Sequence, residues 1–103
     1  MNCNTAKKYI LDTFDELRET FLDKNADYGD SVFHTGPLCS DVCPSKAVAI
    51  RMNDKIKRLA TLMQLDNSAN CRVNESITDT LKDLAVYAII LASIYNAKEE
   101  KDE

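Results

Sequence analysis

Two sets of charged residues in the second half of the chain recur at the spacing of a helical turn. The basic set is Arg51, Lys55 and Arg58, and the acidic set is Glu75, Asp79 and Asp83. Residues three or four positions apart lie on the same side of a helix, so each set is expected to form one stripe. Arginine and lysine can neutralise phosphate oxygens, and carboxylates suit Mg²⁺, which commonly bridges to phosphates.

Two interpretations of these stripes are open. In the first, the basic set pairs with the acidic set across a helix interface, because partly buried charges need partners. In the second, the basic set binds phosphates, and the acidic set binds Mg²⁺ or positions the basic side chains. Apolar residues continue both stripes, with Leu62 after the basic one and Tyr87 among those after the acidic one. This continuation predicts a cleft or an interhelical seam instead of open solvent.

Histidine and cysteine gather in the segment HTGPLCSDVCP, residues 34–44. A structural zinc site takes four ligands, typically in two close pairs. His34, Cys39 and Cys43 supply three ligands at spacings that fit no common zinc finger, and a fourth would have to come from afar. The cysteine pair also lacks the CxxC spacing of redox motifs. We therefore expect no zinc here.

A further acidic group lies in the segment DELRE, residues 15–19, which is similar to the DExxE variant of a Mg²⁺-binding motif. At about 100° per residue, its two glutamates, with Asp12 and Asp23, fall opposite the apolar stripe that runs from Phe14 to Phe21. A solvated face is the simpler interpretation. Metal binding there would need a helix from another subunit.

Three amphipathic helices are expected to position these groups, at about residues 5–25, 45–65 and 76–98. Their apolar stripes recur at the spacing of one helix face. They include Ile10, Phe14, Leu17 and Phe21, then Ala49, Met52, Ile56, Leu59 and Met63, then Ile77, Leu81, Leu84, Ala88 and Leu91.

The positions of the helix-breaking and helix-capping residues support one helical domain spanning residues 1–103. All glycines and prolines fall between positions 29 and 44, which predicts a long loop over residues 26–44. Ser76 and Asp79 have a spacing like that of a capping box, which predicts the start of the third helix. No alternation typical of strands occurs, so the expected fold class is all-α.

The composition is that of a globular protein, with 45% hydrophobic and 29% charged residues. The charged tail, residues 98–103, is expected to fray. No apolar stretch approaches the roughly 20 residues that span a bilayer, and the N-terminus lacks a signal-peptide core, so we expect a cytoplasmic protein that contacts no membrane. The net charge of −4 argues against binding to duplex nucleic acid, which needs a basic footprint.

The third helix is also expected to take part in self-association. Residues 84–95 read LAVYAIILASIY, which is apolar or small nearly all round. Such a helix is buried on every side, and two other helices of a small domain cannot cover it fully. Because soluble monomers rarely keep a large exposed apolar patch, we expect a homo-oligomer, a dimer or higher.

Three segments together resemble a known family. They are KNADYGDS at 24–31, NDKIKRL at 53–59 and ESITDTLKDLAVYA at 75–88. The chain resembles the nucleotide-modification-associated domain family, small helical proteins common in phages and prophages. That family is distantly similar to the all-α nucleoside triphosphate pyrophosphatases of the dimeric dUTPase and MazG type.

The resemblance implies handling of small phosphorylated nucleotides. The matched positions are Lys24, Asp27, Tyr28 and Gly29, then Lys55 and Arg58, then Glu75, Asp79, Asp83 and Tyr87. Tyr28 could stack on a base or simply pack within its loop, and Gly29 would supply a backbone conformation that a side chain forbids. The loop with His34 joins the two segments expected to touch the nucleotide, so we include His34 and Arg51 in the predicted binding set.

Departures from the pyrophosphatase pattern shape the functional prediction. Those enzymes pair ExxE on one helix with ExxD on a later one, whereas here Glu75 is followed by Asp79 and then Asp83, without ExxD. Pyrophosphate cleavage needs Mg²⁺ on the phosphate oxygens and an activated water. We therefore predict a phage-type protein that captures a nucleotide without turnover, for example to sequester a nucleotide immune signal. A Mg²⁺-dependent pyrophosphatase and a structural helical interaction module are the alternatives.

Overall fold

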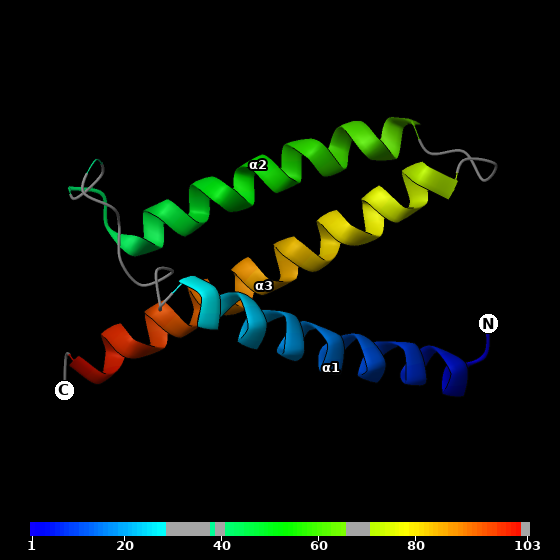
Figure 1. Cartoon of the computed structure of the whole chain (residues 1–103), viewed down its shortest axis with the longest axis horizontal. Coiled ribbons are helices and arrows are strands. Elements are labelled where there is room, and N and C mark those ends of the chain that lie inside the picture. Colours follow the sequence, from blue (N-terminus) through cyan, green and yellow to red (C-terminus); the bar gives the residue numbers. More distant parts are fainter. Residues whose placement is uncertain (29–37, 39–40, 66–70, 102–103) are drawn as a thin grey trace. The chain divides into compact units, whose positions relative to one another are not determined.

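The computed structural model describes residues 1–28, 38, 41–65 and 71–101, and in this part of the chain all regular structure is helical. Helix α1 spans Cys3–Tyr28, α2 spans Pro44–Leu65 and α3 spans Cys71–Lys101 (Figure 1). The predicted all-α class with three main helices is therefore confirmed. The chain divides into two compact units, Met1–Ser31 and Val32–Glu103, and each is described by itself. None of the described helices combines the length and apolar character that crossing a membrane requires.

Helix α1 begins and ends outside its predicted limits. The Asn2 side-chain Oδ1 accepts a hydrogen bond from the Thr5 backbone N–H at 2.8 Å. Asparagine is a favoured N-cap because its side chain satisfies a backbone donor that the first turn leaves unpaired. The helix thus starts at Cys3 instead of near Thr5. It continues to Tyr28 because no helix breaker occurs before the glycine at position 29.

Helix α2 begins at Pro44 and ends at Leu65, close to its predicted limits. The Ala47 N–H donates to the Cys43 carbonyl oxygen at 3.1 Å, so Cys43 stands at the N-cap. Proline suits the first helical position because the N–H that it lacks would have no partner there. Ser45 lies inside the first turn, where it is buried and its Oγ is 3.3 Å from the Cys43 Sγ.

Helix α3 begins at Cys71, so the capping box predicted at Ser76 is wrong. The residues from Cys71 to Glu75 contain neither glycine nor proline, and they continue the helix N-terminally. Thr80 is only 3% exposed, and its hydroxyl donates to the Ser76 carbonyl oxygen at 2.7 Å. This bond satisfies a buried polar group inside the helix. At the other end α3 runs past the predicted limit at residue 98 to Lys101.

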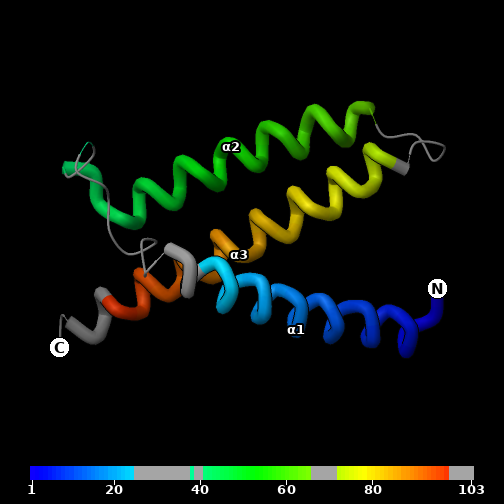
Figure 2. Tube along the Cα trace, in the orientation of Figure 1, coloured from blue at the N-terminus to red at the C-terminus, as the bar shows by residue number. Residues whose placement is uncertain are grey.

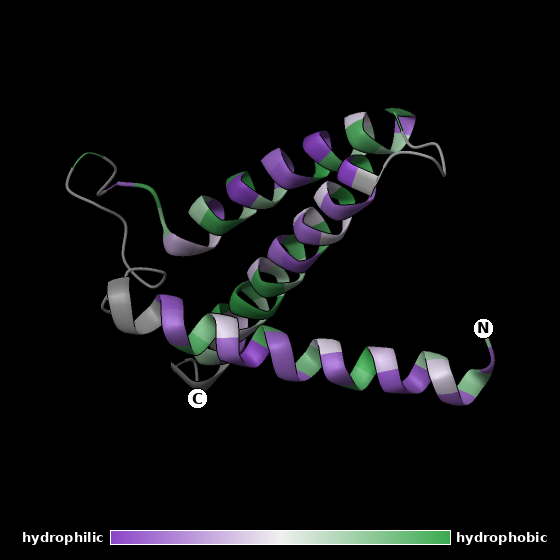
Figure 3. Ribbon diagram, turned by 45° about the vertical axis from the view of Figure 1, so that its right-hand side comes forward, coloured by the Kyte–Doolittle hydropathy of each residue, from purple (hydrophilic) through white to green (hydrophobic). Residues whose placement is uncertain are grey.

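Helices α2 and α3 pack against each other as an antiparallel pair (Figures 1 and 2). Val48 on α2 is 3% exposed, and Ile90 and Ile94 on α3 are 6% and 8% exposed. Hydrophobic and hydrophilic residues occupy different sides of both helices, as Figure 3 shows. Burial of these aliphatic side chains is the main term that holds such a helical hairpin together.

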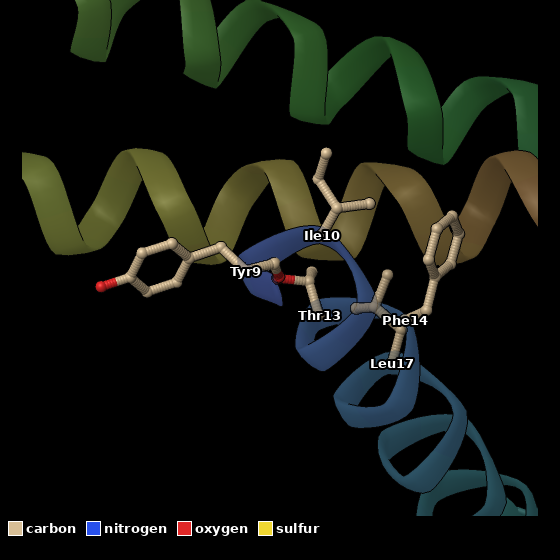
Figure 4. Close-up of a pocket in the computed structure, with 5 residues that line it drawn as sticks. All are labelled: Tyr9, Ile10, Thr13, Phe14 and Leu17. Carbon is tan, nitrogen blue, oxygen red and sulfur yellow. The ribbon is translucent and has the colours of Figure 1, made fainter. Parts of the chain in front are cut away.

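Helix α1 carries its apolar and acidic residues on different sides. Tyr9, Ile10, Thr13, Phe14 and Leu17 line an open depression on this helix (Figure 4). The acidic side chains of the DELRE segment and its neighbours, Asp12, Asp15, Glu16, Glu19 and Asp23, are all exposed. Their exposure agrees with the solvated-face interpretation of this acidic group.

Candidate functional site

The basic face of α2 consists of Arg51, Lys55 and Arg58. The helical repeat brings these three side chains to one side of α2, and about 10 Å of helix axis separates the first from the last. Arg51 and Arg58 are exposed, whereas Lys55 is partly buried beside α3. The face therefore has one accessible guanidinium group on each side of a central ammonium group.

Lys55 forms an ion pair with Asp83 across the hairpin. Its Nζ donates to the Asp83 Oδ2 at 3.0 Å, and the two side chains are 30% and 39% exposed. Ion pairs that remain accessible to water contribute only about 0–1 kcal/mol, because water screens the attraction and two long side chains lose freedom. The pair is thus a weak link that a stronger anion could displace.

This contact also sets which turns of α2 and α3 face each other. In an antiparallel pair, one turn back along α2 corresponds to one turn forward along α3. Starting from Lys55 and Asp83, this count puts Arg51 at the level of Tyr87, which is partly buried. One further turn puts Val48 at the level of Ile90, and the burial of both residues agrees with the count.

The two arginines differ from Lys55 in having no acidic partner among the described residues of the hairpin. Within residues 41–65 and 71–97, neither Arg51 nor Arg58 forms an ion pair, and neither do Glu75 and Asp79, which are exposed. The interpretation in which basic and acidic stripes neutralise each other therefore holds for Lys55 and Asp83 alone in this region.

The predicted Mg²⁺ ligands Glu75, Asp79 and Asp83 lie along one side of α3. About 12 Å of helix axis separates the first from the last, whereas Mg²⁺ holds its ligands at about 2 Å. One ion could therefore be shared by two successive carboxylates at most. Among the described residues, His, Cys, Asp and Glu side chains form no group of three that could hold a metal ion. Metal binding by this acidic set stays a prediction.

The other predicted site residues precede α2. Lys24 is exposed on α1, and Asp27 and Tyr28 belong to the last turn of that helix. Gly29 and His34 lie outside the described residues. Because Lys24, Asp27 and Tyr28 belong to a different unit from the α2–α3 hairpin, a site shared with the hairpin stays a prediction for them. It stays a prediction for Gly29 and His34 too.

The two interpretations of the sequence placed Asp83 either against the basic set or among the metal ligands, and the structure pairs it with Lys55. Both residues were visible as members of charged stripes, but helical spacing within one chain segment carries no information on which turns of two helices meet. A single cross-helix contact supplies that information. Cys3 and Cys43 are both exposed, and neither forms a disulfide within the described part of the chain.

Comparison with protein-family models matches residues 24–94 to the family described as nucleotide modification associated domain 1. The matched region contains the whole basic face, Asp83 and Tyr87, and it omits most of α1. Comparisons with curated proteins and with solved structures give no significant match. Because the family model covers more than half of the sequence, the chain belongs to the nucleotide modification associated domain 1 family.

Proposed function

We propose that this chain binds a small phosphorylated nucleotide on the basic face of α2 and holds it without turnover. Two exposed arginines, Arg51 and Arg58, carry this proposal, because neither has an acidic partner in the described region. They stand out on a chain whose net charge is −4. A guanidinium group can contact two phosphate oxygens at once. Two such groups about two turns apart favour a ligand with several negative charges.

The position of Tyr87 supports one direction for the bound nucleotide along α2. Tyr87 lies at the level of Arg51 and is only partly exposed, so its ring could hold a base by stacking at that end of the face. The phosphates would then extend along α2 toward Arg58. The proposed nucleotide-binding set also includes Lys24, Asp27, Tyr28, Gly29 and His34, which sequence reasoning alone suggests.

Capture without turnover fits the acidic residues better than hydrolysis does. Cleavage of a pyrophosphate bond needs Mg²⁺ and an activated water held by several carboxylates, and Asp83 is already engaged by Lys55. Retention of an unaltered nucleotide would serve a phage protein that sequesters a host immune signal in the cytoplasm. It would equally serve a protein that holds a nucleotide for a modification pathway.

Substitution of the two arginines tests binding directly. Arg51→Ala and Arg58→Ala should each weaken the binding of a retained nucleotide by about tenfold or more, because a hydrogen bond to a charged group is worth about 1.5–3 kcal/mol. Arg72→Ala, which removes an exposed arginine at the start of α3, is the matched control and should bind like the wild type. Mass spectrometry of small molecules released by heat identifies the ligand, and calorimetry measures its affinity. Equal affinity in all four proteins would refute a role for this face.

A Mg²⁺-dependent pyrophosphatase is the second candidate, because Glu75 and Asp79 are exposed one turn apart and could share one ion. A panel of nucleotides incubated with Mg²⁺ or Mn²⁺ tests it, with products separated by chromatography. Turnover that disappears in Asp79→Asn, while circular dichroism stays unchanged, would support hydrolysis. Recovery of unaltered nucleotide from every reaction would support capture.

A further inference from the structure

Lys55 occupies the middle of the basic face, yet it is the one member of that face whose charge is neutralised within the described hairpin. Its partner Asp83 reaches it from α3 at 3.0 Å, while Arg51 and Arg58 have no acidic partner there. A phosphate that contacted both arginines would lie alongside Lys55 and would compete with the Asp83 carboxylate for the same ammonium group.

We propose that Asp83 is a built-in competitor of the ligand, which Lys55 must exchange for a phosphate oxygen when the site fills. This inference rests on the proposed nucleotide-binding function and names the residue that sets the threshold a ligand must overcome. The exchange breaks the Lys55 Nζ to Asp83 Oδ2 hydrogen bond and forms one from the same Nζ to a phosphate oxygen, with no covalent change.

The exposure of the pair makes this exchange feasible. Both side chains are about one-third exposed, so water can reach the Asp83 carboxylate when Lys55 leaves it. A fully buried pair would resist the exchange, because an unpaired charge would be left in the interior. Here a water-accessible pair opposes the ligand only weakly, and a multivalent anion can overcome it.

Competition by Asp83 lowers the affinity for every anion that needs Lys55. The site is competent for binding only in the fraction of molecules in which Lys55 is released, and the apparent affinity falls by that fraction. A chain of phosphates also reaches Arg51 or Arg58, about one turn away on either side, and these added contacts offset the loss of the pair. The inferred ligand class is therefore a nucleotide with two or more phosphates.

Calorimetric titration with inorganic triphosphate and with inorganic monophosphate, both without divalent metal, tests the inference. Asp83→Asn should bind triphosphate about three- to tenfold more tightly than the wild type, since the competing charge is gone. Monophosphate should gain by a similar factor, because both anions need the released Lys55. Asp54→Asn is the matched control, because it removes an exposed carboxylate from α2 that has no ion pair in the described region. Its affinity should stay within about twofold of the wild type.

The outcomes separate this inference from the proposed function. If Asp83→Asn binds triphosphate no more tightly than the wild type, while Arg51→Ala weakens binding, the competitor role is wrong and the binding face survives. If neither the wild type nor Asp83→Asn binds triphosphate or any nucleotide, both ideas fail. Asp83→Ala, checked by circular dichroism, provides a second variant with the same charge change, and a tighter complex in both variants supports the inference.

Discussion

Arg51, Lys55 and Arg58 carry the same charge but stand in different surroundings. The two guanidinium groups are exposed, and the ammonium group is held by Asp83. The type and spacing of these residues were enough to predict a basic stripe on one helix. Which member would be paired could not be predicted, because the pairing depends on how far α2 is displaced along α3. The basic character of the stripe could therefore be predicted, whereas the ion pair of its central residue could not.

Exchange of each arginine for lysine isolates the contribution of the forked guanidinium group. Arg58→Lys keeps the positive charge but offers a single ammonium group instead of two parallel N–H donors. We expect its affinity for the retained nucleotide to fall about threefold or more, through the loss of one charge-assisted hydrogen bond. Calorimetry measures the change, with Arg72→Lys as the control. Unchanged affinity would mean that position 58 contributes only long-range attraction.

The three helices follow from periodicity and from the confinement of glycine and proline to positions 29–44. The ends of the helices were harder to predict. Asn2 caps α1 about three residues before its predicted start at residue 5, and Pro44 starts α2 one residue before its predicted start at residue 45. Capping depends on a local hydrogen bond that competes with many equivalent ones, so a suitable residue type such as Ser76 does not guarantee a helix start.

The revised start of α3 predicts the effect of Ser76→Ala. An N-cap serine replaced by alanine loses about 1 kcal/mol of stability, whereas a serine inside a helix does not, because alanine is the better helix former. Since α3 begins at Cys71, Ser76→Ala should leave the free energy of unfolding within about 0.5 kcal/mol of the wild type or raise it. Urea unfolding followed by circular dichroism provides the measurement. A loss of about 1 kcal/mol would place the start of the helix at Ser76 after all.

At the scale of the whole molecule, several large apolar residues of α3 are exposed. Leu81, Ile89 and Tyr95 are 46%, 54% and 55% exposed, although Ile90 and Ile94 on the same helix are buried. Helix α2 thus covers one side of α3 and leaves other apolar positions to solvent in this chain. We propose that a second copy covers them in a homo-oligomer, since soluble monomers rarely keep such a patch.

A charge introduced on this surface tests self-association. Ile89→Glu should lower the molar mass measured by light scattering to that of one chain, because an unpaired carboxylate is costly to bury in an apolar interface. Ile50→Glu, at an equally exposed apolar position on α2, is the control and should leave the mass unchanged. A wild-type protein that is already a single chain would contradict the oligomer. If Arg51→Ala and Arg58→Ala also bind every nucleotide like the wild type, a purely structural module becomes the better hypothesis.

Helix α1 forms a compact unit of its own, and the family match starts only at Lys24, in its last turns. Selection on ligand binding would then act mainly on the matched segment, and the part of α1 before Lys24 could change in sequence or be replaced by recombination. Related chains could in this way acquire new regulation or new assembly by exchanging this short N-terminal segment. A chimera that keeps residues 24–94 and takes the residues before Lys24 from a relative should bind the same ligand and could differ in its assembly.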